Sequence, residues 1–150
     1  MAKPFPLQTL RDLAQEGSDA AAARLGVVNG HERDMGERLR VLLEYRGEYS
    51  ERLARVTQSG VHSMGLRNFR EFIDKIDSAI ELQRELLAMA KSEVETGQQH
   101  WHSEQRKLKS FDTLSQRHYA AERLSEARQE QKEQDELAMR GFRGRRALVG

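Results

Sequence analysis

Apolar residues recur every three or four positions along the first third of the chain. Alternating steps of four and three from Leu7 to Val56 reach mostly apolar residues, which are Leu7, Ala14, Ala21, Leu25, Val28, Met35, Leu39, Leu42, Tyr49, Leu53 and Val56. The polar interruptions are Arg11, Ser18, Glu32 and Arg46. Because spacing of this kind is typical of a coiled-coil helix, we predict one helix over about residues 7–57.

A second stripe follows the segment TQSGVHSMG, whose glycines and small polar residues predict a turn at about 58–65. It comprises Leu66, Phe69, Ile73, Ile76, Ile80, Leu87, Ala90, Val94, Trp101, Leu108 and Phe111, with Gln83, Gly97 and Glu104 as interruptions. Asn68 with Glu71 forms a possible capping box at the start, and Ser63 is the competing cap. We predict a second helix over about residues 66–140.

A short connection between two long amphipathic helices favours an antiparallel hairpin, since folding back buries both stripes along one seam. The predicted fold is therefore all-α, a single domain of residues 1–150 in which two long helices form an antiparallel coiled coil. In this arrangement Leu42 lies near Ile80, and Leu25 lies near Gly97. Gly97 either permits a close approach of the helices or is a weak point in the second helix.

The second helix is predicted to be longer than the first. The first helix runs back only to about Leu7, opposite residue 115 or so, and the polar stretch 130–140 is left without a partner inside the chain. An isolated polar helix is marginal in water, so this stretch is expected to need a partner protein or to fray without one. Residues 141–150 are predicted to be a flexible basic tail, and phosphate binding by its arginines is a less favoured alternative.

Composition limits the function. Only 37% of residues are hydrophobic and 33% are charged, and the formal net charge of +1 offers no overall field for nucleic acid. About half of the residues are Ala, Glu, Lys, Leu or Arg, as in long helices. There is no cysteine, no signal-peptide pattern and no apolar run of membrane-spanning length, so we expect a cytoplasmic protein.

Catalytic and metal-binding patterns are missing from the sequence. There is no phosphate-binding loop, zinc-protease motif or nucleophile elbow, and an enzyme, a cofactor and a small-molecule substrate are not expected. His100, His102 and Glu104 suggest a metal site, but residues two apart on a helix point in different directions. The other histidines, including His118, stand alone.

One flank of the seam is also apolar near the turn. Tyr45 and Phe72 fall one position outside the seam, beside Leu42, Tyr49, Ile76 and Ala79. A two-helix protein cannot cover both flanks of its seam, so this surface is predicted to bind a partner. The alternative is that Tyr45 and Phe72 simply broaden the seam.

Five features of the chain carry a family resemblance: LQTLRDLA near the start, LLEYRGEY at 42–49, NFREFIDKIDSAIELQ at 68–83, Trp101, and EQKEQDELAMR at 130–140. Together they resemble the FliJ family of flagellar export proteins. The resemblance runs from about residue 5 to residue 140, and nothing is carried over to the tail.

The resemblance implies a non-enzymatic, stalk-like coiled coil of the flagellar type III export apparatus, cytoplasmic and peripherally associated with the inner membrane. Its implied partners are the hexameric export ATPase FliI, the export gate protein FlhA, and export chaperones. The gate-binding residues would be Leu42, Tyr45, Tyr49, Phe72, Ile76 and Ala79. The ATPase-binding residues would be Leu7, Leu10, Leu13, Gln131, Asp135, Glu136 and Met139.

Two other interpretations remain open. One is a related stalk protein of a virulence type III secretion system, and the other is a generic coiled-coil scaffold that associates with itself through its overhang. The family resemblance favours a protein that is monomeric when free, which sedimentation distinguishes from a self-associating scaffold.

Overall fold

The computed structural model describes residues 3–60 and 63–149, and these form two helices. Helix α1 spans Gln8–Gln58 and helix α2 spans Ser63–Val149. The second helix is longer than the first, and the described residues contain no strand, so the all-α prediction is confirmed. The chain divides into two compact units, one made of residues 19–103 and the other of residues 1–18 with 104–150.

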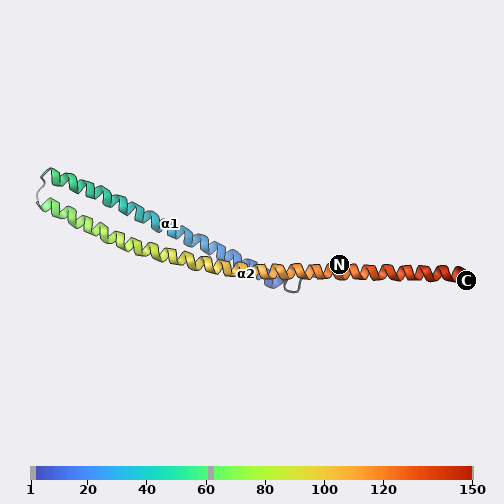
Figure 1. The fold of residues 1–150 in the computed structure, drawn as a ribbon. Helices are drawn as coiled ribbons and strands as arrows, with labels where there is room; N and C mark the ends of the chain where they lie inside the picture. The colour runs from blue at the N-terminus through green and yellow to red at the C-terminus, as the bar shows by residue number, and fades with distance from the viewer. Residues whose placement is uncertain (1–2, 61–62, 150) are drawn as a thin grey trace. The chain divides into compact units, whose positions relative to one another are not determined.

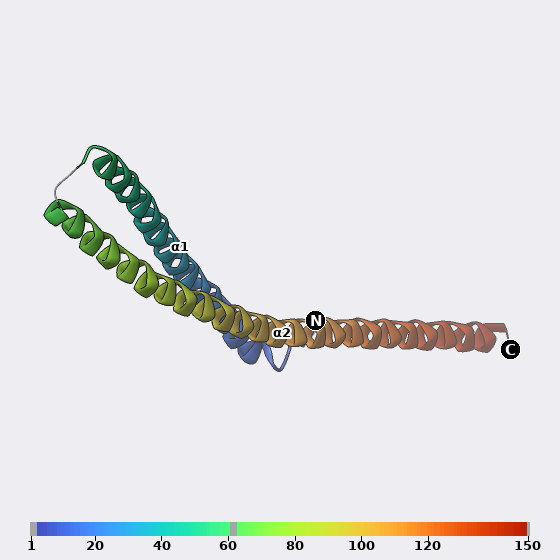
Figure 2. The same ribbon diagram turned by 60° about the vertical axis from the view of Figure 1, so that its left-hand side comes forward.

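In residues 19–103 the two helices run antiparallel and side by side, as Figures 1 and 2 show in blue to green for α1 and green to orange-yellow for α2. The seam contains the predicted apolar residues: Ala21, Met35, Ile73, Ile76, Ile80, Ala90 and Val94 are all buried. Residues three and four apart on a helix share one face, and the burial of these residues confirms the predicted seam in this unit.

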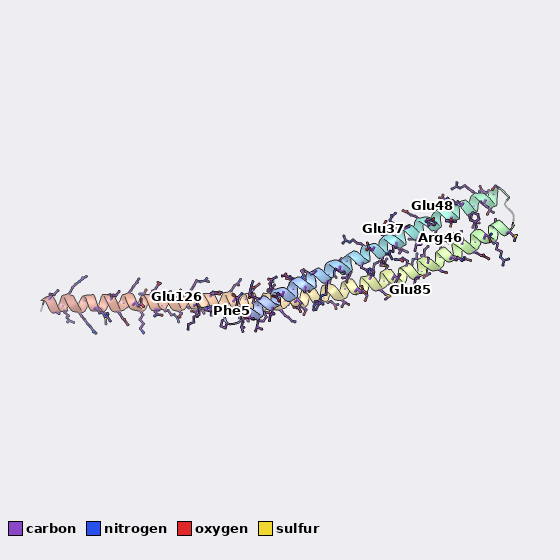
Figure 3. The ribbon with its side chains drawn as sticks, turned by 180° about the vertical axis from the view of Figure 1, so that it is seen from behind. Phe5, Glu37, Arg46, Glu48, Glu85 and Glu126 are labelled. Atoms are coloured by element: carbon purple, nitrogen blue, oxygen red, sulfur yellow. The ribbon has the colours of Figure 1, made fainter. Side chains whose placement is uncertain are left out.

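Polar residues complete this seam instead of breaking it. Gln83 is 8% exposed, and its Nε2 donates a hydrogen bond of 3.0 Å to the carbonyl oxygen of Met35. Arg46 donates from Nε to Oδ1 of Asp77 at 2.5 Å, and Figure 3 shows this side chain between the helices. Each polar side chain that the heptad pattern brings to the seam at these two positions therefore has a partner on the other helix.

Gly97 allows a close approach of the helices. A Cβ atom at this position would lie 3.3 Å from Cδ1 of Leu25 and 3.4 Å from Cγ2 of Val28. The predicted proximity of Leu25 and Gly97 is confirmed, and the close approach is the better of the two interpretations of this glycine.

The turn is shorter than predicted. Helix α1 continues to Gln58 and α2 begins at Ser63, which makes Asn68 an internal residue and excludes it as the cap. Gly60 has a φ of 74°, the left-handed conformation that glycine adopts without steric cost at the end of a helix. Of the predicted turn 58–65, residues 61–62 lie outside the described residues.

In the other unit, residues 3–18 pack along the part of α2 that begins at Glu104. Arg11 donates from Nε to Oδ1 of Asp112 at 2.6 Å, and Gln105 donates from Nε2 to Oγ of the buried Ser18 at 3.1 Å. Phe5 is 6% exposed against α2, where Figure 3 labels it.

Within this unit the far part of α2 has no neighbour. Every residue from 127 to 148 is exposed, and residues 3–18 end well before this stretch (Figure 1, orange to red). The predicted overhang is present, but the helix continues past its predicted end at 140 to Val149. The segment 141–149, predicted to be a flexible tail, is therefore helical in the structure.

Candidate partner-binding surfaces

An aromatic cluster lies near the turn end of residues 19–103. The ring centroids of Tyr45 and Tyr49 are 5.6 Å apart, and Tyr49 lies 4.6 Å from Phe72 and 6.4 Å from Phe69. Tyr45 and Tyr49 belong to α1, and Phe69 and Phe72 belong to α2. Tyr49 lies in the seam, whereas Tyr45 and Phe72 flank it. Aromatic contacts at such distances stabilise the pairing of the helices.

The cluster is nevertheless open to solvent. Tyr45 is 48% exposed and Phe72 is 41% exposed, whereas Ile76 is buried and Leu42, Tyr49 and Ala79 are half-buried. The six residues predicted to bind the export gate thus comprise an exposed aromatic pair resting on a partly buried base. A surface of this type fits a protein partner, since exposed aromatic residues anchor many interfaces.

Charged groups border the cluster. The guanidinium carbon of Arg52 lies 5.4 Å from the ring centroid of Tyr49, within the range of a cation–π contact. The hydrogen bond that Arg46 donates to Asp77 raises the pKa of the Arg46 guanidinium, so this cation is fixed at any accessible pH. The border therefore offers cationic side chains that hydrogen-bond or stack.

The residues predicted to bind the export ATPase do not form one patch. Leu7, just before α1, is 37% exposed, and Leu10 and Leu13 in its first two turns are 47% and 56% exposed. Residue 118 of α2 contacts this N-terminal segment through Phe5, and Gln131 lies thirteen residues farther along, a distance of about 20 Å at the usual rise. The residues of this prediction therefore lie on two separate surfaces of the same unit.

The second of these surfaces, on α2 from Gln131 to Met139, carries side chains of both charges. Gln131 donates from Nε2 to Oδ1 of Asp135 at 3.3 Å. A shallow groove on the same helix is lined by Lys132, Asp135, Glu136, Met139, Arg140 and Arg143. Met139 is 58% exposed between these charges. Acids, bases and one flexible apolar side chain on a single helix face suit a polar partner surface.

His118 of α2 contacts the segment before α1, and the sequence did not predict this contact. A ring nitrogen of His118 lies 2.9 Å from the carbonyl oxygen of Lys3, and its ring centroid lies 5.7 Å from that of Phe5. The predicted seam begins at Leu7, after Phe5. Phe5 also precedes α1, so helical spacing could not relate it to His118.

Metal chemistry finds no support in the described residues. Across 3–60 and 63–149 no three His, Cys, Asp or Glu side chains are grouped so that they could hold a metal ion. In the same residues, neither helix contains a stretch apolar enough to cross a membrane.

The antiparallel helix pair of residues 19–103, with its heptad-spaced seam, is typical of coiled-coil proteins. The chain matches the family model described as "Flagellar FliJ protein" over residues 2–147. It is 34% identical to the flagellar FliJ protein of Salmonella typhi and 31% identical to that of Escherichia coli strain K12. Both comparisons cover 93% of this chain and 95% of the relative. The chain belongs to the FliJ family of flagellar proteins.

Proposed function

We propose that this chain is a non-enzymatic component of the flagellar type III export apparatus that links the export ATPase to the export gate and assists chaperone and substrate delivery. Membership in the flagellar family supports the export role and favours it over the virulence-secretion alternative. The observation that carries the linking role is the presence of exposed surfaces in both units, the aromatic cluster in one and the bare end of α2 in the other.

The gate would bind at Leu42, Tyr45, Tyr49, Phe72, Ile76 and Ala79. Tyr45 and Phe72 supply apolar area that is already exposed, and the contacts of both with Tyr49 hold them in place before binding. Little conformational entropy would then be lost on association, which favours affinity.

The ATPase would bind Leu7, Leu10 and Leu13 together with Gln131, Asp135, Glu136 and Met139. The first set lies beside the part of α2 near His118, and the second lies about 20 Å farther along α2. A ring of subunits that surrounds the helices is therefore better suited to contact both sets than a single small domain. A mixed-charge face makes weak contacts with successive subunits, and this suits a part that transmits the ATPase cycle to the gate.

The first experiment is a pull-down against the purified export ATPase and the cytoplasmic domain of the gate. The double variant Tyr45→Ala/Phe72→Ala should lose gate binding and keep ATPase binding and helicity. A variant without residues 126–150 should lose ATPase binding and keep gate binding. If the aromatic variant loses helicity as well, those side chains hold the helices together and the gate assignment is wrong.

The second experiment is sedimentation equilibrium of the free chain. A monomer agrees with the linking role. A stable dimer that dissociates when residues 126–150 are removed would support a self-associating scaffold and contradict the proposal.

A further inference from the structure

Three large apolar side chains lie exposed on α2 beyond the aromatic cluster. Leu82 is 58% exposed, Leu86 is 37% exposed and Met89 is 61% exposed. Their spacing of four and three places them on one face of the helix, next to the buried stripe and separate from it. This stripe, which we call the outer stripe, lies in the unit of residues 19–103.

Heptad spacing connects the outer stripe to the side of the coil that carries Phe72. Leu86 lies fourteen residues after Phe72, and Met89 lies seven after Leu82, so all four share one flank of α2. The opposite flank has Asp77, Arg84 and Lys91 at the same seven-residue spacing. One flank of the seam is thus apolar and the other is charged. If solvent covered both flanks of the helix pair, both would be expected to be polar.

A groove continues the outer stripe toward the C-terminal side. It has a volume of about 440 Å³ and is lined by Ala21, Arg24, Val28, Ser92, Glu93, Thr96, Gly97 and His100. Glu93 follows Leu86 by seven residues, and Thr96 follows Met89 by seven, so the groove lies on the same flank. The missing side chain of Gly97 contributes to its depth. Stripe and groove together run for about 22 Å, or four helical turns, from Leu82 to Gly97.

The outer edge of the stripe is acidic. A shallow surface depression beside Leu82 is lined by Ser78, Glu81 and Glu85 and reaches Asp77 on the charged flank, and Figure 3 shows Glu85 on the side of α2 that faces away from α1. Glu81 pairs with Arg84 at 3.2 Å, and Asp77 pairs with Arg46. Among the described residues Glu85 has no ion pair, so it is available to a cation beside the apolar stripe.

We propose that the outer stripe and the Gly97 groove bind one amphipathic helix of a partner protein, which packs on the coil as a third helix. The ligand helix has about fifteen residues, with apolar side chains at positions i, i+4 and i+7 and with lysine or arginine along the edge that meets Glu85. This surface is separate from the one assigned to the gate, and its use does not depend on the flagellar function.

Charge decides against a second copy of this chain as the occupant. A symmetric antiparallel pair centred on Leu82 and Leu86 would place Glu81 and Glu85 of one chain beside the same residues of the other. Like charges that face each other across a helix interface are destabilising. A foreign helix with a basic edge avoids this repulsion.

The test uses the full chain and two labelled synthetic helices of eighteen residues. Both helices have leucine at alternating steps of three and four, and one has lysine along its edges where the other has glutamate. Affinity is measured by fluorescence anisotropy for three variants: Leu82→Ser/Met89→Ser, Thr96→Trp, which fills the groove, and Glu85→Lys. The matched control, Leu43→Ser/Leu124→Ser, removes two exposed leucines from outside the stripe. Circular dichroism verifies that each variant remains helical.

The lysine-edged helix should bind the parent chain at least about tenfold more tightly than the glutamate-edged one. The stripe variant and Thr96→Trp should each weaken binding by about tenfold. Glu85→Lys should reduce or reverse the preference for the lysine-edged helix. The control and Tyr45→Ala/Phe72→Ala should bind as the parent does. Equal affinity of the parent and the stripe variant, or equal affinity for both helices, would overturn the proposal. A parent dimer that the stripe variant abolishes would show that the occupant is a second copy.

Discussion

Arg46 of α1 and Asp77 of α2 form an ion pair across the seam, with Nε of Arg46 2.5 Å from Oδ1 of Asp77. The heptad pattern places Arg46 where an apolar residue would otherwise lie, so the pair joins the helices at that level. Both side chains are more than two-fifths exposed, which means that solvent screens much of their attraction.

We predict that Asp77→Asn lowers the melting temperature by a few degrees at low salt, and that the difference shrinks in molar salt because the lost attraction is screened there. Thermal unfolding followed by circular dichroism measures both. Glu81→Gln is the matched control, since it breaks a pair within α2 and should have a smaller effect. An effect of Asp77→Asn that does not depend on salt would show that packing, not charge, is responsible.

Gln83 is a buried polar residue of the seam in residues 19–103, and its amide donates to the carbonyl oxygen of Met35. Gln83→Ala should lower the free energy of unfolding by about 1 kcal/mol or somewhat more, because a hydrogen bond is lost and a small cavity remains. Gln83→Leu should recover most of this loss by filling the space. Urea denaturation measures the change, and the exposed Gln98→Ala should stay close to the parent. A loss for leucine as large as that for alanine would show that the hydrogen bond matters more than the volume.

Gly97 and Gly47 make a matched pair of helical glycines. A Cβ at Gly47 meets nothing within 4 Å, whereas one at Gly97 presses on Leu25 and Val28. Gly47→Ala should therefore raise the free energy of unfolding by up to about 1 kcal/mol through helix propensity. Gly97→Ala should gain clearly less, because the neighbouring side chains must move. Equal gains in urea denaturation would mean that the close approach has no energetic consequence.

Glu37 accepts a hydrogen bond from Arg40, and this bond holds the pKa of the Glu37 carboxyl below its ordinary value of 4.5. A group whose pKa is depressed in the folded state stabilises that state above its unfolded pKa, and this contribution is lost as the pH falls through the folded pKa. The pair is fully exposed, so the effect on stability is small, and carboxyl chemical shifts are the better measurement. Arg40→Gln should return the pKa of Glu37 to about 4.5. An unchanged titration in this variant would assign the shift to another group.

The helices and their seam were predictable because the signal is repeated many times. Ile73, Ile76 and Ile80 occupy one face only if the segment is helical. The connection between the two helices is short, so they can pack against each other only in antiparallel orientation. The polar residues Arg46 and Gln83 looked like interruptions in the sequence. Only the opposite helix reveals their partners, since Asp77 and the carbonyl of Met35 lie 31 and 48 residues away in the chain.

The ends of the helices were less predictable for a physical reason. Helix termini depend on local capping and on single residues, so by sequence α2 could start at Ser63 or Asn68. The basic tail after residue 140 was expected to be flexible, but α2 continues to Val149. The aromatic cluster was anticipated from Tyr45 and Phe72. The outer stripe was not, because exposure of Leu82 and Met89 depends on which flank the partner helix leaves open.

The bare end of α2 gives the protein a segment whose order is nearly independent of the rest. Residues 127–148 make no seam contacts, so their backbone amides are held only by the hydrogen bonds of a single helix, and these open without unfolding the hairpin. Binding of a partner to this segment would cost the conformational entropy of ordering it, so the resulting complex would dissociate more readily than one formed on a rigid surface.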